Sequence, residues 1–132
     1  MSKSTHKKYK KKWYQKYQWR EYVAPQAREK ADHQCELCGM SNDDHQYKNG
    51  CSLHVHHIID RCKFVPAMED GRTDEDRIRK IANDQTNLVA LCASCHKQKI
   101  EQLSIEEQCR LLQRQDPRSL LDLPKLVLNQ LN

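Results

Sequence analysis

Apolar residues are sparse in this chain of 132 residues and occur in short runs between long polar stretches. Residues 52–59 form one such run, and their β-branched side chains favour a strand. A second apolar run, Leu88–Leu91, predicts another strand that ends at Cys92. Helix-forming residues then dominate residues 93–100. The centre of the chain therefore predicts two short strands followed by a helix, which is an α+β arrangement.

The segments around the first strand are polar. Residues 41–50 carry Asn, Asp and Gly and predict a loop. Residues 60–86 are mostly charged or polar, and Thr73–Ala82 within them predicts a short capped helix. We interpret residues 58–86 as an insertion beside the strand.

Residues 101–132 predict a C-terminal helical extension that packs on the domain. Ser104 and Glu107 match a capping box, and Pro117 is expected to end the helix that begins there. Apolar and partly polar positions at helical spacing within it are Ile105, Gln108, Cys109 and Leu112. The apolar stretch Leu120–Leu131 predicts another helix, whose leucines either complete the core or offer a face to a partner.

Residues 1–34 form a basic leader with interleaved aromatic side chains, and the chain carries a formal charge of +5. The leader predicts helix before Pro25 and again from there to about His33. The cations that precede the first acidic residue are Lys3, Lys7, Lys8, Lys10, Lys11, Lys12, Lys16 and Arg20. Such a block suits a polyanion, so Lys8, Lys11 and Lys12 are candidate DNA contacts. A solvated arm that orders only on meeting a partner is an equally open alternative.

Composition limits the classes of protein to consider. Hydrophobic residues make up 37% of the chain and Phe occurs once, which predicts one domain with a small core that a metal ion would help to stabilise. Seven cysteines without a leading apolar signal segment favour a reducing cytoplasm over a secreted disulfide scaffold. No apolar run approaches the roughly 18 residues that span a membrane, so no membrane partner is expected.

Two Cys-x-x-Cys pairs stand out among the cysteines: Cys35 with Cys38, and Cys92 with Cys95. Each two-residue gap lets both sulfurs of a pair face one ion, so the four thiolates predict a closed structural zinc site. Two disulfides or two unrelated turns are the alternatives. Because 53 residues separate the pairs, zinc would join the ends of a folded unit. The cysteines that remain, Cys51, Cys62 and Cys109, are interpreted as ordinary thiols.

The order of motifs from residue 35 to about 100 resembles the zinc-stapled HNH endonucleases. After the first cysteine pair come Val55-His56-His57-Ile58, then Asn87-Leu88, and then Leu91-Cys92-x-x-Cys95-His96-x-x-Lys99. This resemblance implies a ββα-metal (His-Me finger) nuclease domain over residues 35–100. It also implies hydrolysis of DNA phosphodiester bonds with one catalytic cation.

The resemblance assigns a role to each residue of the motif. His57 would be the general base that takes a proton from the attacking water. His56 and His96 would bind the divalent cation. Asn87 would orient His57 by accepting a ring N–H through its side-chain carbonyl oxygen. Lys99 would contact a phosphate, although a solvated helix lysine is an equal alternative.

Two features of the motif leave questions open. Neighbours on a regular strand point to opposite faces, so the pleat would pair His56 with His54, which is a rival ligand, unless the strand ends at His57. Many relatives carry an acidic residue where this chain has His56. Imidazole ligands favour Mn²⁺, Ni²⁺, Co²⁺ or Zn²⁺, with Mg²⁺ possible as a second choice.

The alternative function is a catalytically silent zinc module that binds nucleic acid or protein through the leader and the tail. Such a module needs the cysteines but has no use for the full set of histidines and Asn87. Small nucleases of the family that this chain resembles act in restriction or beside phage packaging proteins, so the resemblance implies the cytoplasm of a bacterial or phage-infected host cell. The sequence does not choose between these settings.

Overall fold

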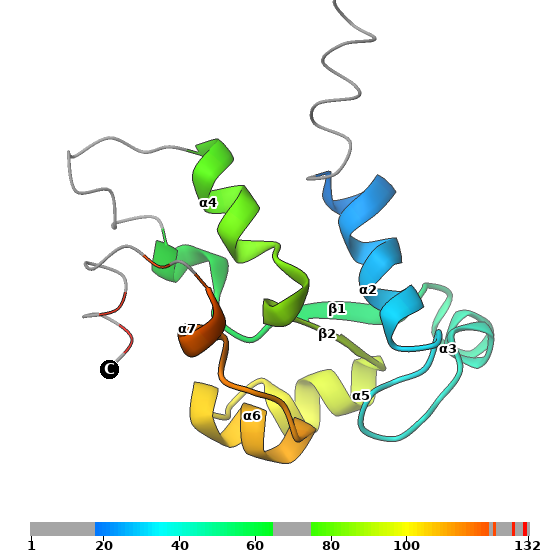
Figure 1. Ribbon diagram of the computed structural model, residues 1–132. Helices are drawn as coiled ribbons and strands as arrows, with labels where there is room; N and C mark the ends of the chain where they lie inside the picture. The colour runs from blue at the N-terminus through cyan, green and yellow to red at the C-terminus, as the bar shows by residue number, and fades with distance from the viewer. Residues whose placement is uncertain (1–17, 65–74, 122, 124–127, 129–130, 132) are drawn as a thin grey trace, which may run out of the picture.

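The computed structural model describes residues 18–64, 75–121, 123, 128 and 131 of the chain. In these residues, helices surround a two-stranded antiparallel sheet in a small α+β arrangement (Figure 1). With η marking a 3-10 or π-helical turn, the elements are η1 Trp19–Val23, α2 Ala24–Lys30, α3 Asn42–Asn49, β1 His54–His57, η2 Arg61–Phe64, α4 Glu75–Ala82, η3 Gln85–Asn87, β2 Leu88–Leu91, α5 Ala93–Cys95, η4 His96–Ile100, α6 Ile105–Leu112 and α7 Pro117–Leu120.

The sheet consists of β1 and β2, paired so that His54 lies opposite Leu91 and His57 opposite Leu88. Both predicted strands are confirmed, although β1 is shorter than the predicted run 52–59. All four residues of β2 are buried, which explains why that strand is a continuous apolar run without alternation.

Each face of the sheet is covered by helix. On one face, Leu88 packs with Val23 of η1 and Ala27 of α2. On the other face, Val89 belongs to the same apolar cluster as Cys109 of α6. Figure 1 shows the same arrangement, with α2 on one side of the strands and α5 and α6 on the other. The strands are therefore the middle layer of the molecule, and successive side chains face different helices.

Several predicted helices are confirmed with small changes in their ends. Helix runs from Trp19 through Pro25 to Lys30, three residues short of the predicted end. The predicted helix 93–100 is present as α5 followed directly by η4. In α6, the capping box of Ser104 is complete, with hydrogen bonds in both directions between its side chain and backbone and those of Glu107.

The prediction of a loop over residues 41–50 is wrong, because this segment forms α3. The Ser41 hydroxyl accepts a hydrogen bond from the Asp44 N–H and begins the helix, and Gly50 ends it at a φ of +74°. Ser and Asp at a helix start and Gly just past its end are helix-boundary signals as well as loop signals.

The prediction that Pro117 ends α6 is also wrong. That helix ends at Leu112, where Gln113 adopts a left-handed conformation with a φ of +55°. Pro117 instead occupies the first position of α7, where proline needs no N–H partner and its fixed φ suits a helix.

Most of the predicted helix Leu120–Leu131 lies outside the described residues. Of its leucines, Leu121, Leu123, Leu128 and Leu131 pack in a second apolar cluster around Ile59 and Phe64. Within the part of the chain that the structure describes, no helix is long and apolar enough to cross a membrane.

Candidate functional site

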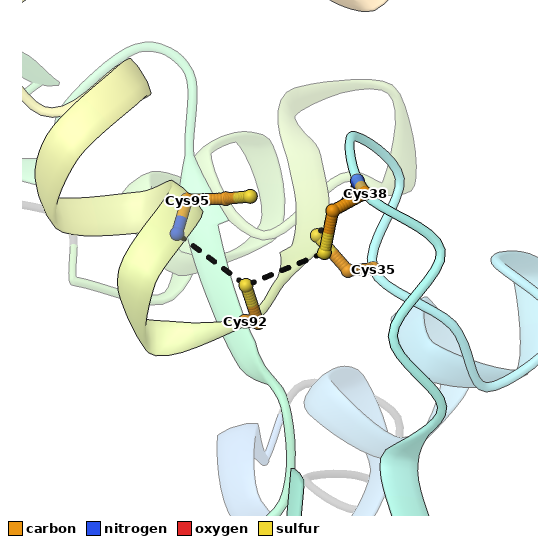
Figure 2. Close-up of side chains that lie close together, drawn as sticks. All are labelled: Cys35, Cys38, Cys92 and Cys95. Atoms are coloured by element: carbon orange, nitrogen blue, oxygen red, sulfur yellow. Dashed lines mark hydrogen bonds between the residues drawn. The ribbon is translucent and has the colours of Figure 1, made fainter. Parts of the chain in front are cut away.

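The four cysteines of the two Cys-x-x-Cys pairs meet at one point (Figure 2). Their sulfur atoms all lie within 4.8 Å of one another, and the sulfurs of Cys38 and Cys92 are 3.6 Å apart. Two thiolates bound to one tetrahedral zinc ion, each at about 2.3 Å, lie about 3.8 Å apart. The cluster could therefore hold a structural metal ion such as zinc. All seven cysteines are free thiols, so the alternative of two disulfides is wrong for this structure.

Backbone N–H groups point at the sulfurs, as expected around thiolates. Cys35 Sγ accepts from the Cys38 N–H at 3.5 Å, and Cys92 Sγ accepts from the Cys95 N–H at 3.4 Å. Burial raises the pKa of the Cys35 thiol, but the N–H groups around it outweigh burial and lower that pKa to about 7. Burial and the neighbouring thiols raise the pKa of Cys95. A bound cation would favour the ionised form of all four crowded thiols.

Glu36, which lies between Cys35 and Cys38, connects the first cysteine pair to β2. The Glu36 N–H donates to the Ala90 carbonyl oxygen at 3.0 Å, and the Glu36 carboxylate accepts from the Ala90 N–H at 2.8 Å. The same carboxylate forms an ion pair with Arg114 at 2.7 Å. Because Cys92 directly follows β2, these contacts hold the first cysteine pair close to the second.

A row of imidazoles lies on the α6 side of the sheet, next to the cysteine cluster. His54 and His56 alternate along β1 and both contact His96, the first residue of η4. The ring nitrogens of His54 (Nδ1) and His96 (Nδ1) are 3.2 Å apart, and those of His96 (Nε2) and His56 (Nδ1) are 3.1 Å apart. The predicted pairing of His54 with His56 on one face of the strand is confirmed.

His56 and His96 are thus in contact, as expected for two ligands of one cation. Two imidazole nitrogens on a tetrahedral ion, each at about 2.0–2.1 Å, are about 3.3 Å apart, close to the separation seen here. Burial lowers the pKa of both rings, which favours the neutral form that can donate a lone pair. Within the described residues, however, the cysteines are the one group of three or more such side chains whose ligand atoms all come within 4.8 Å.

His57 points to the opposite face from His56. Its ring stacks on Trp19 of η1 with centroids 4.8 Å apart and planes inclined by 18°. Its Nε2 lies 2.7 Å from the Asn83 side-chain oxygen. An amide oxygen only accepts, so Nε2 carries the proton and Nδ1 keeps the lone pair. Burial lowers the pKa of this ring, partly offset by the Asn83 contact and by the charge of Asp60.

A cavity of about 420 Å³ opens beside His57. The cavity is lined by His57, by the two side chains that contact its ring and by two arginines, which together are Trp19, His57, Arg61, Arg79 and Asn83. Arg61 lies close enough for its charge to lower the pKa of His57 further. The cavity therefore sets the His57 ring beside two positively charged side chains.

The expected contact between Asn87 and His57 is not what the structure contains, because Asn83 is the partner of His57. The Asn87 side chain is fully buried and is used on the backbone. Its Oδ1 accepts from the Ile59 N–H at 2.8 Å, and its Nδ2 donates to the carbonyl oxygens of Ile59 at 3.1 Å and Ala82 at 2.9 Å. Asn87 thus joins the end of α4 to the chain just past β1, and shapes the site without touching His57.

Replacing Asn87 with Ala should lower the free energy of unfolding by about 3 kcal/mol, because three backbone groups at a buried point lose their partner. The measurement is urea unfolding followed by circular dichroism. Asn49→Ala, at an exposed position of α3, serves as control and should change the value by less than about 0.5 kcal/mol. Equal small effects of the two changes would contradict the structural role of Asn87.

The remaining predicted contacts lie apart from the histidines or outside the described residues. Lys99 is exposed on η4 and lines a separate, open hollow with Leu103, Glu107 and Arg110. Lys8, Lys11 and Lys12 lie outside the described residues, so their contact with DNA remains a prediction.

Sequence reasoning missed two residues that hold the site, Asn83 and Gln108. Gln108 Oε1 lies 2.8 Å from His56 Nε2. A signal for Gln108 was present, since it occupies a polar position within the apolar stripe of α6. Asn83 gave no such signal, because its contact depends on where α4 ends. His45 is a buried structural histidine, whose nitrogens contact the Cys51 carbonyl oxygen and the Ala93 N–H.

Comparison with models of known protein families, with curated proteins and with solved structures found no match to this chain.

Proposed function

We propose that this chain is a metal-dependent DNA endonuclease with a ββα-metal core of the HNH type, stapled by zinc at the four cysteines. The observation that carries the proposal is the pair of imidazole nitrogens of His56 and His96, 3.1 Å apart at the junction of strand and helix. The order of motifs in the sequence, which resembles that family, supports the same conclusion.

His57 is the general base in this proposal. The contact with Asn83 leaves Nδ1 as the basic nitrogen, and the stacked Trp19 restrains the ring. A water molecule that attacks phosphorus would transfer its proton to Nδ1 while the bond from phosphorus to the 3′ oxygen breaks. Arg61 and Arg79, which line the cavity beside the ring, would attract the phosphate.

Because His56 and His57 face opposite sides of β1, one phosphate would have to reach both of them around the end of the strand. Asp60 follows three residues after β1. Burial lowers the pKa of both rings, and the charge of Asp60 partly offsets that effect in each. A phosphate across the end of β1 would reach His57 from one side and the pair of His56 and His96 from the other.

A divalent cation bound by His56 and His96 would neutralise charge on the phosphate and on the leaving oxygen. The donor set of two neutral imidazoles suits Mn²⁺, Ni²⁺, Co²⁺ or Zn²⁺ better than Mg²⁺.

The proposal predicts that the protein converts supercoiled plasmid to nicked or linear forms in the presence of Mn²⁺ or Ni²⁺, and more slowly with Mg²⁺. Gel electrophoresis of the plasmid after incubation with each ion is the measurement, and excess chelator should stop the reaction. Intact plasmid with all three ions would contradict the proposal and favour a silent zinc module.

Metal content separates the same two functions independently of cleavage. In the enzyme, one tightly bound zinc should survive the double change His56→Ala with His96→Ala, whereas a second, weaker site should be lost. A silent module would bind a single ion in both proteins.

A further inference from the structure

Gln108 lies outside residues 35–100, the segment that resembles the nuclease family, and its side chain contacts the His56 ring. We propose that Gln108 of α6 is a positioning residue that holds His56 in the tautomer whose Nδ1 binds the cation. The inference rests on the proposed function only in taking His56 and His96 as cation ligands. It makes the C-terminal extension part of the site rather than packing alone.

The Gln108 amide can adopt one orientation only. Its Nε2 donates to the Leu103 carbonyl oxygen at 3.0 Å, so Oε1 is the atom that faces His56 Nε2 at 2.8 Å. Gln108 is 5% exposed, and a hydrogen bond in such a buried place is stronger than one at the surface. Both polar ends of a side chain in a core position are therefore satisfied by specific partners.

This orientation decides where the proton of His56 lies. The amide oxygen accepts and cannot donate, so His56 Nε2 must carry the proton and Nδ1 must carry the lone pair. Nδ1 is the nitrogen that faces His96 Nε2 at 3.1 Å. Without an acceptor at Nε2, the neutral ring could place its proton on Nδ1 instead, and His56 would present an N–H to the cation site.

The His96 ring can also direct a lone pair toward the cation site. His96 Nδ1 lies 3.2 Å from His54 Nδ1, so a protonated His96 Nδ1 can donate a hydrogen bond to His54. His96 Nε2 is then free to act as a ligand. Two lone pairs then face each other across the separation expected for two nitrogens on one ion. Contacts of this kind behind a metal-bound histidine are worth about 10- to 100-fold in metal affinity.

The test compares cation binding by the wild type with that of Gln108→Leu, Gln108→Glu and Gln102→Leu. Leu and Glu both lose the bond to the Leu103 carbonyl oxygen, so both variants carry the cost of that loss. Only Glu keeps an acceptor for His56 Nε2. Gln102 is exposed just before α6 and serves as the matched control.

Full-length protein loaded with zinc is titrated with Ni²⁺ by calorimetry, with zinc content and the melting temperature recorded for each variant. Gln108→Leu is expected to weaken Ni²⁺ binding about 10- to 100-fold. Gln108→Glu should bind at least as tightly as the wild type, and Gln102→Leu should bind equally.

Unchanged Ni²⁺ affinity in Gln108→Leu would overturn the inference, and so would an equal loss in Gln108→Glu. In either case, wild-type protein that cleaves plasmid would leave the proposed function intact. Conversely, the expected order of affinities in a protein that cleaves no DNA would support the role of Gln108 and contradict the nuclease. Absence of Ni²⁺ binding by the wild type beyond the zinc site would overturn the inference together with the cation site.

Discussion

Cys92→Ser is expected to abolish the cooperative thermal transition of the domain and to reduce its zinc content from one equivalent to near zero. Structural zinc sites contribute on the order of 10–16 kcal/mol to folding at neutral pH. A small domain has a total stability of about 5–15 kcal/mol. Loss of the ion is therefore comparable to the whole stability of this chain.

The position of the cysteines makes this expectation stronger than for a peripheral site. Cys35, Cys92 and Cys95 are themselves buried members of the main apolar cluster, together with Leu53 and Ile100. Without a cation, four thiols remain crowded at the point where the first cysteine pair meets the end of β2.

The measurement is circular dichroism during heating, combined with metal analysis by atomic absorption. A strong chelator should produce the same loss in the wild type, and added zinc should restore the transition. Cys62→Ser is the matched control, because Cys62 is exposed on η2 and outside the cluster. Wild-type protein that keeps its melting temperature after complete removal of zinc would contradict the structural role of the metal.

The sheet and the cysteine cluster could be predicted because each depends on local patterns. The apolar run Leu88–Leu91 is buried on both faces, and the two-residue gaps of the cysteine pairs fix the direction of the sulfurs. The alternation of strand side chains also predicted that His54 and His56 share a face. It could not predict the register that places them opposite Leu91 and Val89, or the arrival of His96 beside both.

There is a physical reason why the sequence does not predict the hydrogen-bond partner of His57. Asn83 and Asn87 are separated by one helical turn in sequence, and either amide can orient an imidazole. The choice depends on where α4 ends relative to β1, which is a tertiary property. In the structure, the backbone around Ile59 uses all the polar atoms of Asn87 and leaves Asn83 to contact the ring. The buried Asn87 amide satisfies backbone groups first, because leaving those groups unpaired costs more free energy than a contact with another side chain gains.

His57→Ala is expected to lower the rate of plasmid cleavage by about 10³-fold, because the variant has no group to accept the proton of the attacking water. Cation binding should not change, since His57 faces Trp19 and Asn83 rather than His56 and His96. A large loss of rate with unchanged Ni²⁺ affinity is the signature of a base. A metal ligand would lose both together.

Two further variants test how the ring is held for this task. Asn83→Ala removes the acceptor that fixes the proton on Nε2, and it should lower the rate by about 10-fold while leaving the Ni²⁺ affinity unchanged. His33→Asn changes an exposed histidine with a φ of +57°, a conformation that Asn tolerates, and should leave the rate as it is. Rates are compared by single-turnover nicking with excess enzyme, so that chemistry and not product release is observed. Cleavage by His57→Ala at the wild-type rate would remove the general base from the mechanism. The imidazole pair of His56 and His96 would then remain as a cation site without a general base at His57.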